Sequence, residues 1–312
     1  MEDLTSCSRI GAGNIIHHLH GHDNSSLESC SIATCVWAPA ITFFDPVTDE
    51  LDLTSQSTYY KYLSESGLVG LVILGTNAET FLLTREERAA LIKCARKSVA
   101  PDYPLMAGVG GHSTKQVLEY ISDAAQAGAN YVLLLPCAYF GPATSESVIR
   151  NFFAQVADAS PLPIVLYNFP GVCNGVDLSS SLIASLAQAH PKIVGVKLTC
   201  GSVGKITRLT ALLPASRFSV YGGQSEHAYS GGERLIYADF LIGGLSVGSA
   251  GCIAAFANVF PRTISHIFTL WKEGKVAEAL ALHQKASLAE EPCKAGIAST
   301  KFAASCFSAQ RA

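Results

Sequence analysis

The sequence predicts an α/β fold, the (β/α)8 or TIM barrel with a C-terminal helical extension, and three observations support this fold class. From Val36 onward, short apolar runs that end in Gly, Pro or Asn alternate with longer amphipathic runs rich in Ala, Leu and Glu. Such alternation is typical of parallel strands joined by helices. Eight apolar runs can be counted, which favours a closed barrel over an open sheet. The length of 312 residues would allow two average domains, but it also suits one barrel of roughly 250 residues with additions.

The strands are expected where four to seven apolar residues precede a turn residue, because such runs fit the buried sheet of a barrel. The expected strands are Trp37–Phe43, Leu68–Leu74, Pro104–Val109, Tyr131–Leu135, Ile164–Tyr167, Ile193–Lys197, Phe218–Tyr221 and Leu245–Ser249.

The helices are expected between these runs, and Thr84 followed by Glu87 has the spacing of a capping box. The expected helices are Ser55–Ser66, Arg85–Ser98, Thr114–Ala127, Ser145–Ala159, Ser179–Gln188, Val203–Leu213, Phe260–Glu273, Lys275–Glu290 and Ala295–Ser308. We therefore expect a disordered leader over 1–35, a barrel over 36–258 with an insertion near 226–239, and C-terminal helices over 259–312.

The composition excludes several classes of protein. Hydrophobic residues make up 49% of the chain, charged residues 15%, and 22 Lys and Arg stand against 25 Asp and Glu. The apolar content excludes general disorder, and the lack of a basic run argues against a nucleic-acid partner. No apolar run approaches the ~20 residues of a membrane span. The ten cysteines are scattered, so most are expected to be buried thiols in a reducing compartment.

The leader predicts a cytoplasmic protein. It contains Glu2, Asp3 and Glu28 with only Arg9 as a basic partner, whereas a mitochondrial presequence is rich in Arg and poor in acids. A secretory apolar segment is also missing. Cytoplasmic location is the expectation that remains.

A histidine cluster in the leader raises the question of a metal site. His17, His18, His20 and His22 lie in a polar segment, where a solvated tract is the commoner reading than a ligand set. No second Cys or His pair follows at a zinc spacing. We therefore expect no metal.

Lys197 is the strongest candidate for a catalytic residue. It ends the apolar run that begins at Ile193, and the carboxyl ends of barrel strands form the active-site mouth. A desolvated amine there can attack a ketone and form a Schiff base. The alternative is a lysine at the solvent rim that pairs with a carboxylate.

Tyr167 and Thr76 strengthen the catalytic interpretation. Tyr167 ends the preceding strand, so its phenol would lie beside Lys197 and could move protons. Thr76, in the turn after the second strand, could hydrogen-bond that phenol, and the amides of Thr76 and Asn77 could receive a carboxylate. The alternatives are a packed aromatic residue and an ordinary turn threonine.

Three motifs resemble a known family. The segments 75–80 (GTNAET), 167–171 (YNFPG) and 194–201 (VGVKLTCG) are similar to those of the dihydrodipicolinate synthase and N-acetylneuraminate lyase family of class I aldolases. The resemblance implies that Lys197 forms a Schiff base with pyruvate and that Tyr167 is the acid and base. It also implies that Thr76 relays protons and that Asn77 helps to hold the pyruvate carboxylate. No metal or organic cofactor is implied, and the expected partners are a small 2-oxo acid substrate and further copies of the chain in a dimer or tetramer.

Departures from the synthase pattern favour a lyase. The arginine that grips a substrate carboxylate in true synthases is replaced by Val172, and Ala138 occupies the place of a tyrosine donated to the neighbouring subunit. Whether Tyr139, one position later, takes the place of that tyrosine stays open from the sequence. The chain is closer in motif to fungal 2-keto-3-deoxy-sugar-acid aldolases and 4-hydroxy-2-oxoglutarate aldolases. We therefore expect cleavage of a 4-hydroxy-2-oxo acid, such as 2-keto-3-deoxy-L-galactonate (L-threo-3-deoxy-hexulosonate) or 4-hydroxy-2-oxoglutarate, to pyruvate and an aldehyde.

Further hydroxyl and amide side chains lie near strand ends and could bind substrate hydroxyls. These are Thr199, Ser202, Gln224 and Ser225, of which Thr199 and Gln224 are the main candidates. The alternative is that these residues only form turns.

Two alternatives to a lyase remain open from the sequence. One is a condensing enzyme like dihydrodipicolinate synthase. The other is a catalytically impaired barrel that serves in binding or assembly, because the segment 225–239 is longer than the family's usual connection and the chain ends at Ala312, where relatives usually continue. The persistence of Lys197, Tyr167 and Thr76 favours activity.

Overall fold

A closed barrel of eight parallel strands forms the centre of the protein. The structure is a computed structural model that describes residues 32, 34–223 and 240–308. Each strand pairs with its sequence neighbours, and β1 pairs with β8 to close the ring. The strands are β1 Cys35–Pro39, β2 Gly70–Ile73, β3 Leu105–Gly108, β4 Tyr131–Leu134, β5 Ile164–Asn168, β6 Ile193–Leu198, β7 Ser219–Gly223 and β8 Gly251–Ile253. The predicted fold class is confirmed.

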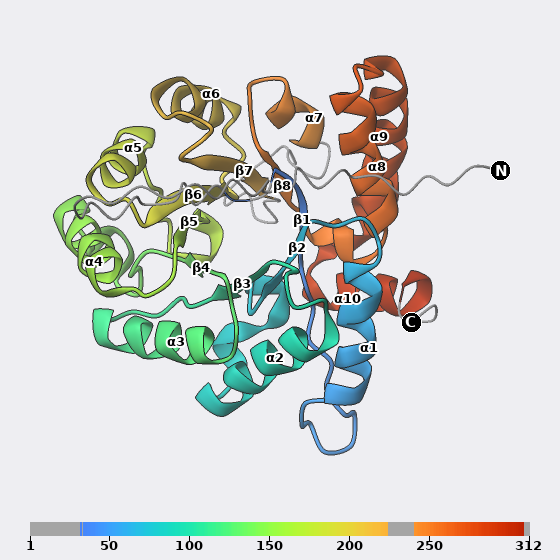
Figure 1. The fold of residues 1–312 in the computed structure, drawn as a ribbon, viewed down its shortest axis with the longest axis horizontal. Coiled ribbons are helices and arrows are strands. Elements are labelled where there is room, and N and C mark those ends of the chain that lie inside the picture. The colour runs from blue at the N-terminus through green and yellow to red at the C-terminus, as the bar shows by residue number, and fades with distance from the viewer. Residues whose placement is uncertain (1–31, 33, 224–239, 309–312) are drawn as a thin grey trace, which may run out of the picture.

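Helices surround the barrel, one after each strand (Figure 1). They are α1 Leu53–Ser64, α2 Arg85–Ser98, α3 Thr114–Gln126, α4 Glu146–Ala159, α5 Ser180–Ala189, α6 Val203–Leu212, α7 Phe240–Leu245 and α8 Pro261–Lys272. At the start of α2, the Thr84 side chain accepts from the Glu87 amide and the Glu87 side chain accepts from the Thr84 amide, as the capping box predicted. Seven of these helices lie close to their expected positions, and α7 was not expected.

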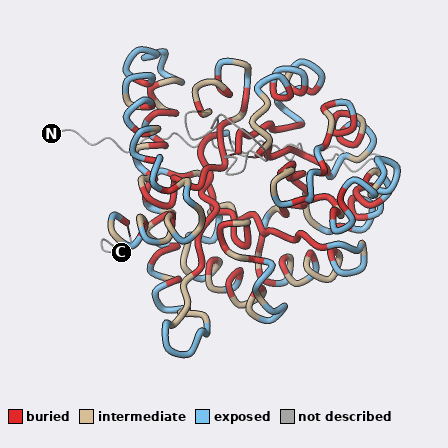
Figure 2. Tube along the Cα trace, turned by 180° about the vertical axis from the view of Figure 1, so that it is seen from behind, coloured by how far each residue is buried: buried red, intermediate tan, exposed pale blue. Residues whose placement is uncertain are grey.

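The strands are apolar because both of their faces are covered. All six residues of β6 and all five of β5 are buried, and Figure 2 shows buried chain at the centre and exposed chain on the outer sides of the helices. Trp37 of β1 lies directly over Gly70 of β2. A Cβ atom on Gly70 would lie only 2.3 Å from the Trp37 ring. The core is therefore packed, and the substrate must bind at a mouth of the barrel.

The predicted eighth strand is wrong. Leu245–Ser249 contains the end of α7 and the turn after it, while β8 begins at Gly251. The turn is a Schellman motif: Gly248 has a φ of 93°, its amide donates to the Leu245 carbonyl, and the Ser249 amide donates to the Gly244 carbonyl. An apolar run was thus read as a strand although it closes a helix.

Two predicted segments fall largely outside the described residues. These are the leader over 1–35 and the insertion near 226–239. At the edge of the leader, Ile32 is buried and its carbonyl accepts from Ser219 Oγ at 3.5 Å. Cys35 already belongs to β1.

The C-terminal extension returns to the barrel. Helix α9, Val276–Glu290, packs along α8 and leads through the short helix η6, Glu291–Ala295, into α10, Ile297–Phe307. Lys301 of α10 pairs with Glu79 at 2.8 Å, and Ser308 Oγ donates to the Asn258 carbonyl at 2.6 Å. In Figure 1, α10 accordingly lies near α1 and the first strands. No helix within the described residues is long and apolar enough to cross a membrane.

A close backbone contact between β3 and the end of β2 yields a prediction about stability. Leu74 has a φ of 64°. A Cβ atom on Gly108 would lie 1.9 Å from the carbonyl oxygen of Leu74. We expect Gly108→Ala to lower the free energy of unfolding by about 1–3 kcal/mol, because the added methyl must displace backbone. Gly243→Ala is the control, since nothing lies within 4 Å of its Cβ position in α7. Urea denaturation measures both, and equal stability of the two variants would refute the argument.

Candidate active site

Lys197, Tyr167 and Thr76 meet at the carboxyl ends of β6, β5 and β2. Tyr167 on β5 and Lys197 on β6 are register partners. Lys197 Nζ donates to Tyr167 Oη at 3.2 Å, and Tyr167 Oη lies 3.3 Å from Thr76 Oγ1. The three predicted residues therefore form one continuous line of polar atoms.

Two of the three side chains in this line, Lys197 and Tyr167, are buried. Lys197 is 4% exposed and Tyr167 is 3% exposed, and Lys197 Nζ also lies 4.2 Å from the centre of the Tyr167 ring. Among the described residues, no carboxylate forms an ion pair with Lys197. The geometry differs from that of a rim lysine paired with a carboxylate, the alternative that the sequence left open.

The turn after β2 presents two amides to the same space. Thr76 and Asn77 open the short helix η1, Thr76–Ala78, so their N–H groups have no acceptor within that helix. The turn is fixed from one side by Thr42, whose hydroxyl donates to the Ala78 carbonyl at 2.9 Å. From the other side it is fixed by the Glu79–Lys301 ion pair. A carboxylate near Lys197 could accept from these amides.

A second polar cluster holds the end of β5 in place. Asn168, fully buried, donates to Asp177 at 2.7 Å and accepts from the Leu178 amide at 2.9 Å. Lys205 of α6 pairs with the same Asp177 oxygen. The Asn168 carbonyl also accepts from the Thr199 amide at 2.8 Å. These bonds tie the end of the strand that carries Tyr167 to the end of the strand that carries Lys197.

A cavity of about 370 Å³ opens above Lys197. Its lining is Pro39, Thr76, Asn77, Tyr167, Phe169, Val172, Lys197, Ile253, Ala255, Ala295, Gly296 and Ile297. Most of the apolar members were not predicted to lie at the site. Pro39 and Ile253 end strands and could have been found by the barrel rule, whereas nothing local in the sequence points to Ala295–Ile297.

The remaining predicted residues lie in different places. Thr199 is 1% exposed and does not line the cavity; its hydroxyl has no hydrogen-bond partner within the described residues. Ser202 caps α6 by accepting from the Lys205 amide. Gln224 and Ser225 lie outside the described residues.

Two cysteines that follow β4 and β5, Cys137 and Cys173, are poor candidates for a nucleophile. Burial raises the pKa of the Cys173 thiol to about 12, and it also raises the pKa of Cys137. A protonated thiol is a poor nucleophile. Within the described residues, no group of three or more His, Cys, Asp or Glu side chains could hold a metal ion, and the histidines of the leader lie outside them.

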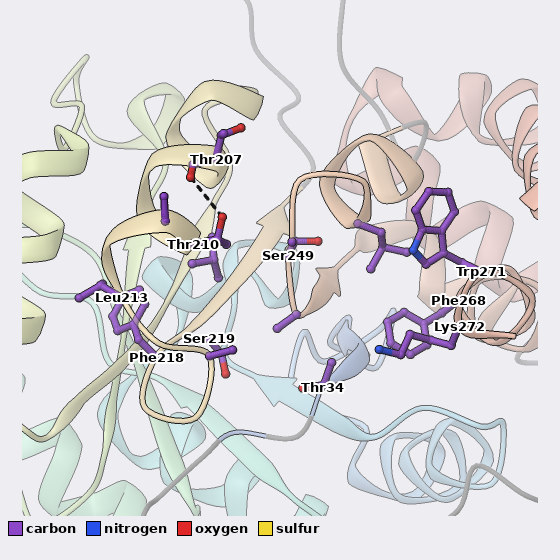
Figure 3. A pocket seen from close by; sticks show the side chains of 16 residues that line it. Thr34, Thr207, Thr210, Leu213, Phe218, Ser219, Ser249, Phe268, Trp271 and Lys272 are labelled. Atoms are coloured by element: carbon purple, nitrogen blue, oxygen red, sulfur yellow. Dashed lines mark hydrogen bonds between the residues drawn. The ribbon is translucent and has the colours of Figure 1, made fainter. Parts of the chain in front are cut away.

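A larger cavity of about 710 Å³ lies away from this site. Figure 3 shows Thr207 and Thr210 of α6 on one side of it and Phe268, Trp271 and Lys272 of α8 on the other. Part of its lining directly precedes strands, at Thr34, Phe218 and Ala250, and the lining contains none of the predicted catalytic residues. Reactive groups in TIM barrels lie at the opposite end.

Residues 33–300 match the model of the dihydrodipicolinate synthetase family. The chain belongs to this family. The resemblance drawn from the three motifs is thereby confirmed, and the match covers the barrel together with most of the C-terminal helices.

Named relatives of this dihydrodipicolinate synthetase family member include aldolases. One relative, from Coccidioides immitis (strain RS), is named as a mitochondrial 4-hydroxy-2-oxoglutarate aldolase and is 66% identical in sequence. The alignment covers 89% of this chain and 84% of that relative. The L-threo-3-deoxy-hexylosonate aldolase of Aspergillus niger is 37% identical, over 86% of this chain and 84% of that relative. The crystal structure of the Escherichia coli K12 prophage protein YagE in complex with pyruvate matches with a TM-score of 0.77 and 29% identity over 87% of each chain. These names agree with the predicted aldolase class.

The comparison contradicts the predicted cytoplasmic location of this family member. The relative at 66% identity is named as a mitochondrial protein. The prediction depended on the acidic residues and the single arginine of the leader. Composition over so short a segment was an insufficient criterion.

Proposed function

We propose that the protein is a class I aldolase that cleaves a 4-hydroxy-2-oxo acid to pyruvate and an aldehyde through a Schiff base on Lys197. The observation that carries the proposal is the line from the buried Lys197 Nζ through the buried Tyr167 Oη to the half-buried Thr76 Oγ1, with steps of 3.2 and 3.3 Å. An amine can form a Schiff base with a ketone, and a phenol beside it can transfer the protons of that reaction. The aldolase names of the relatives support the same reaction.

The proposed reaction begins with attack of the Lys197 amine on the C2 ketone. Tyr167 gives its proton to the departing hydroxyl, which leaves as water and yields the iminium. The resulting phenolate then takes the proton of the C4 hydroxyl as the C3–C4 bond breaks. The aldehyde departs, and the electron pair of that bond is held as an enamine. Tyr167 next protonates C3, and water hydrolyses the iminium to release pyruvate and the free amine.

The turn at Thr76 has two roles in this proposal. The amides of Thr76 and Asn77 donate to the substrate carboxylate next to the ketone, which orients C2 toward Lys197. The Thr76 hydroxyl hydrogen-bonds the Tyr167 oxygen and stabilises its phenolate form. Thr199 and Gln224 stay predicted contacts for substrate hydroxyls.

The test is pyruvate release by the purified protein from a panel of 4-hydroxy-2-oxo acids, coupled to lactate dehydrogenase. We expect pyruvate from at least one member of the panel. Consumption of pyruvate with a carboxylate-bearing aldehyde, without cleavage of any panel member, would indicate the condensing enzyme instead. A folded protein with neither activity would indicate the impaired barrel.

A homo-oligomer, a dimer or a tetramer, is part of the proposal. An exposed aromatic cluster supports it: Phe81 stacks on His112, His112 contacts Tyr139, and Tyr139 contacts Phe140. Phe81, Tyr139 and Phe140 are all exposed large side chains, as is common at association surfaces. Sedimentation velocity is expected to give at least the dimer mass, and a monomer at micromolar concentration would refute this part.

A further inference from the structure

We propose, on the basis of the function proposed above, that Thr80 holds a buried water molecule that connects the Thr76 hydroxyl to solvent. This water gives Tyr167 a route for exchanging its proton that does not pass through the substrate. The proposal starts from a small cavity of about 10 Å³ next to the catalytic turn. We call it the Thr80 cavity, and Thr76, Thr80, Phe81 and Tyr167 belong to its lining.

The Thr80 cavity brings three hydroxyl groups together. Thr76 and Tyr167 share a hydrogen bond at 3.3 Å, and Thr80 supplies the third hydroxyl. The rest of its lining within the described residues is apolar or glycine and comes from the ends of β2 to β5 and the turns after them. Residues 224–239 follow β7, on the opposite side of the ring. A cavity of this volume holds about one water, and hydroxyls are the partners that a buried water needs.

The Thr80 hydroxyl is the group that calls for this water. Thr80 is 5% exposed, and its Oγ1 has no hydrogen-bond partner within the described residues. Burying a hydroxyl without a partner is costly, and buried polar groups that lack a protein partner commonly bind an ordered water. A water between Thr80 and Thr76 satisfies the first hydroxyl and extends the line that begins at Lys197.

Arg88 fixes Thr80 at the cavity. The buried guanidinium of Arg88 donates to the Thr80 carbonyl at 3.1 Å and to the Gly108 carbonyl at 3.0 Å, and it lies 4.0 Å from the centre of the Tyr120 ring. Thr80 and Gly108 both line the Thr80 cavity. Because Arg88 binds the backbone of Thr80, the Thr80 side chain is left to bind the water.

The water acts in one reaction of the site more than in another. In the proposed cleavage, Tyr167 passes the proton of the C4 hydroxyl to C3, so that cycle closes without the water. With pyruvate alone, the Tyr167 phenolate takes a proton from C3, and the same proton returns unless the phenol first exchanges it. The Thr76 hydroxyl accepts from the phenol and donates to the water, which exchanges with solvent near Phe81, a residue that is 53% exposed.

The exchange of the pyruvate methyl protons in deuterium oxide, followed by proton NMR, tests the inference. Thr80→Val keeps the shape of the side chain and removes the hydroxyl. We expect exchange to be about tenfold slower in this variant, the effect of one lost hydrogen bond, while kcat for cleavage stays within about twofold of the wild type. Thr80→Ser keeps the hydroxyl and is expected to exchange at the wild-type rate. Unchanged exchange in Thr80→Val, or an equal loss of exchange and cleavage, would overturn the inference.

A second variant removes the space for the water and keeps Thr80. A Cβ atom on Gly110 would lie 3.2 Å from Phe81 and 3.3 Å from Leu135, and all three residues line the Thr80 cavity. Gly110→Ala is therefore expected to slow exchange as Thr80→Val does, and it decides the question if Thr80→Val fails to fold. Exchange at the wild-type rate in Gly110→Ala would contradict the water.

Ser265→Ala is the control for the loss of a buried hydroxyl. Ser265 on α8 is buried, its Oγ has no hydrogen-bond partner within the described residues, and it lines neither the Thr80 cavity nor the cavity above Lys197. We expect wild-type exchange in this variant. Slower exchange there would show that the effect is not specific to Thr80.

These results are distinguishable from failure of the proposed function. If the wild-type protein neither exchanges the protons of pyruvate nor forms a borohydride-trapped adduct, the aldolase proposal itself fails. If the wild-type protein does both and the Thr80 and Gly110 variants exchange as fast as it does, only the inference about the water fails.

Discussion

Replacing Lys197 by alanine is expected to reduce pyruvate release by at least about 1,000-fold, since the variant lacks the nucleophile on which the whole sequence of steps depends. The side chain is buried at the end of β6, and its amine donates to Tyr167 at 3.2 Å. Within the described residues no other amine lines the cavity. The residual rate would come from binding and orientation alone.

The covalent intermediate can be measured separately from turnover. Borohydride reduction of the wild-type protein with pyruvate is expected to add one pyruvyl group to Lys197, located by peptide mass mapping. Lys93→Ala removes an exposed lysine on α2 and is expected to keep both the adduct and the activity. An adduct elsewhere in folded wild-type protein, or full activity of Lys197→Ala, would refute the assignment.

The sequence was sufficient to place Tyr167 beside Lys197 because the strands that carry them are locally determined. The apolar runs predict ends at Tyr167 and Lys197, one residue before the observed ends of β5 and β6 at Asn168 and Leu198. The barrel rule then places the last side chains of adjacent strands at one height, and Tyr167 and Lys197 are indeed register partners. The capping box at Thr84 is equally local and was equally predictable.

The eighth strand and the C-terminal part of the cavity lining were not predictable in this way. β8 has three residues, too few for a pattern to separate it from the apolar helix end before it. Ala295–Ile297 reach the cavity because α9 turns back along α8 and because Lys301 meets Glu79, which lies 222 residues away in the sequence. A long-range ion pair leaves no periodicity in the sequence.

Replacing Tyr167 by phenylalanine is expected to lower kcat by about 100- to 10,000-fold, the usual contribution of a positioned acid or base. The ring would still fill its place beside Lys197, but the oxygen that lies between Lys197 Nζ and Thr76 Oγ1 would be gone. Loss of water from the first adduct and proton removal from the C4 hydroxyl would both slow. The Schiff base with pyruvate is still expected to form, because the amine remains.

The comparison of trapping and turnover therefore decides the role of Tyr167. Tyr167→Phe is expected to be trapped by borohydride with pyruvate to the same final extent as the wild-type protein, but more slowly, and to have a much lower kcat. This combination would show that the variant has lost proton transfer and has kept its nucleophile. Tyr139→Phe tests separately whether Tyr139 takes part, and it is expected to keep the wild-type kcat, because Tyr139 is exposed and does not line the cavity. If Tyr139→Phe lowered kcat as strongly as Tyr167→Phe, the proton relay would extend to Tyr139, in place of the tyrosine missing at Ala138. If Tyr167→Phe kept the wild-type kcat, Tyr167 would be a packing residue, and another group would have to protonate the enamine.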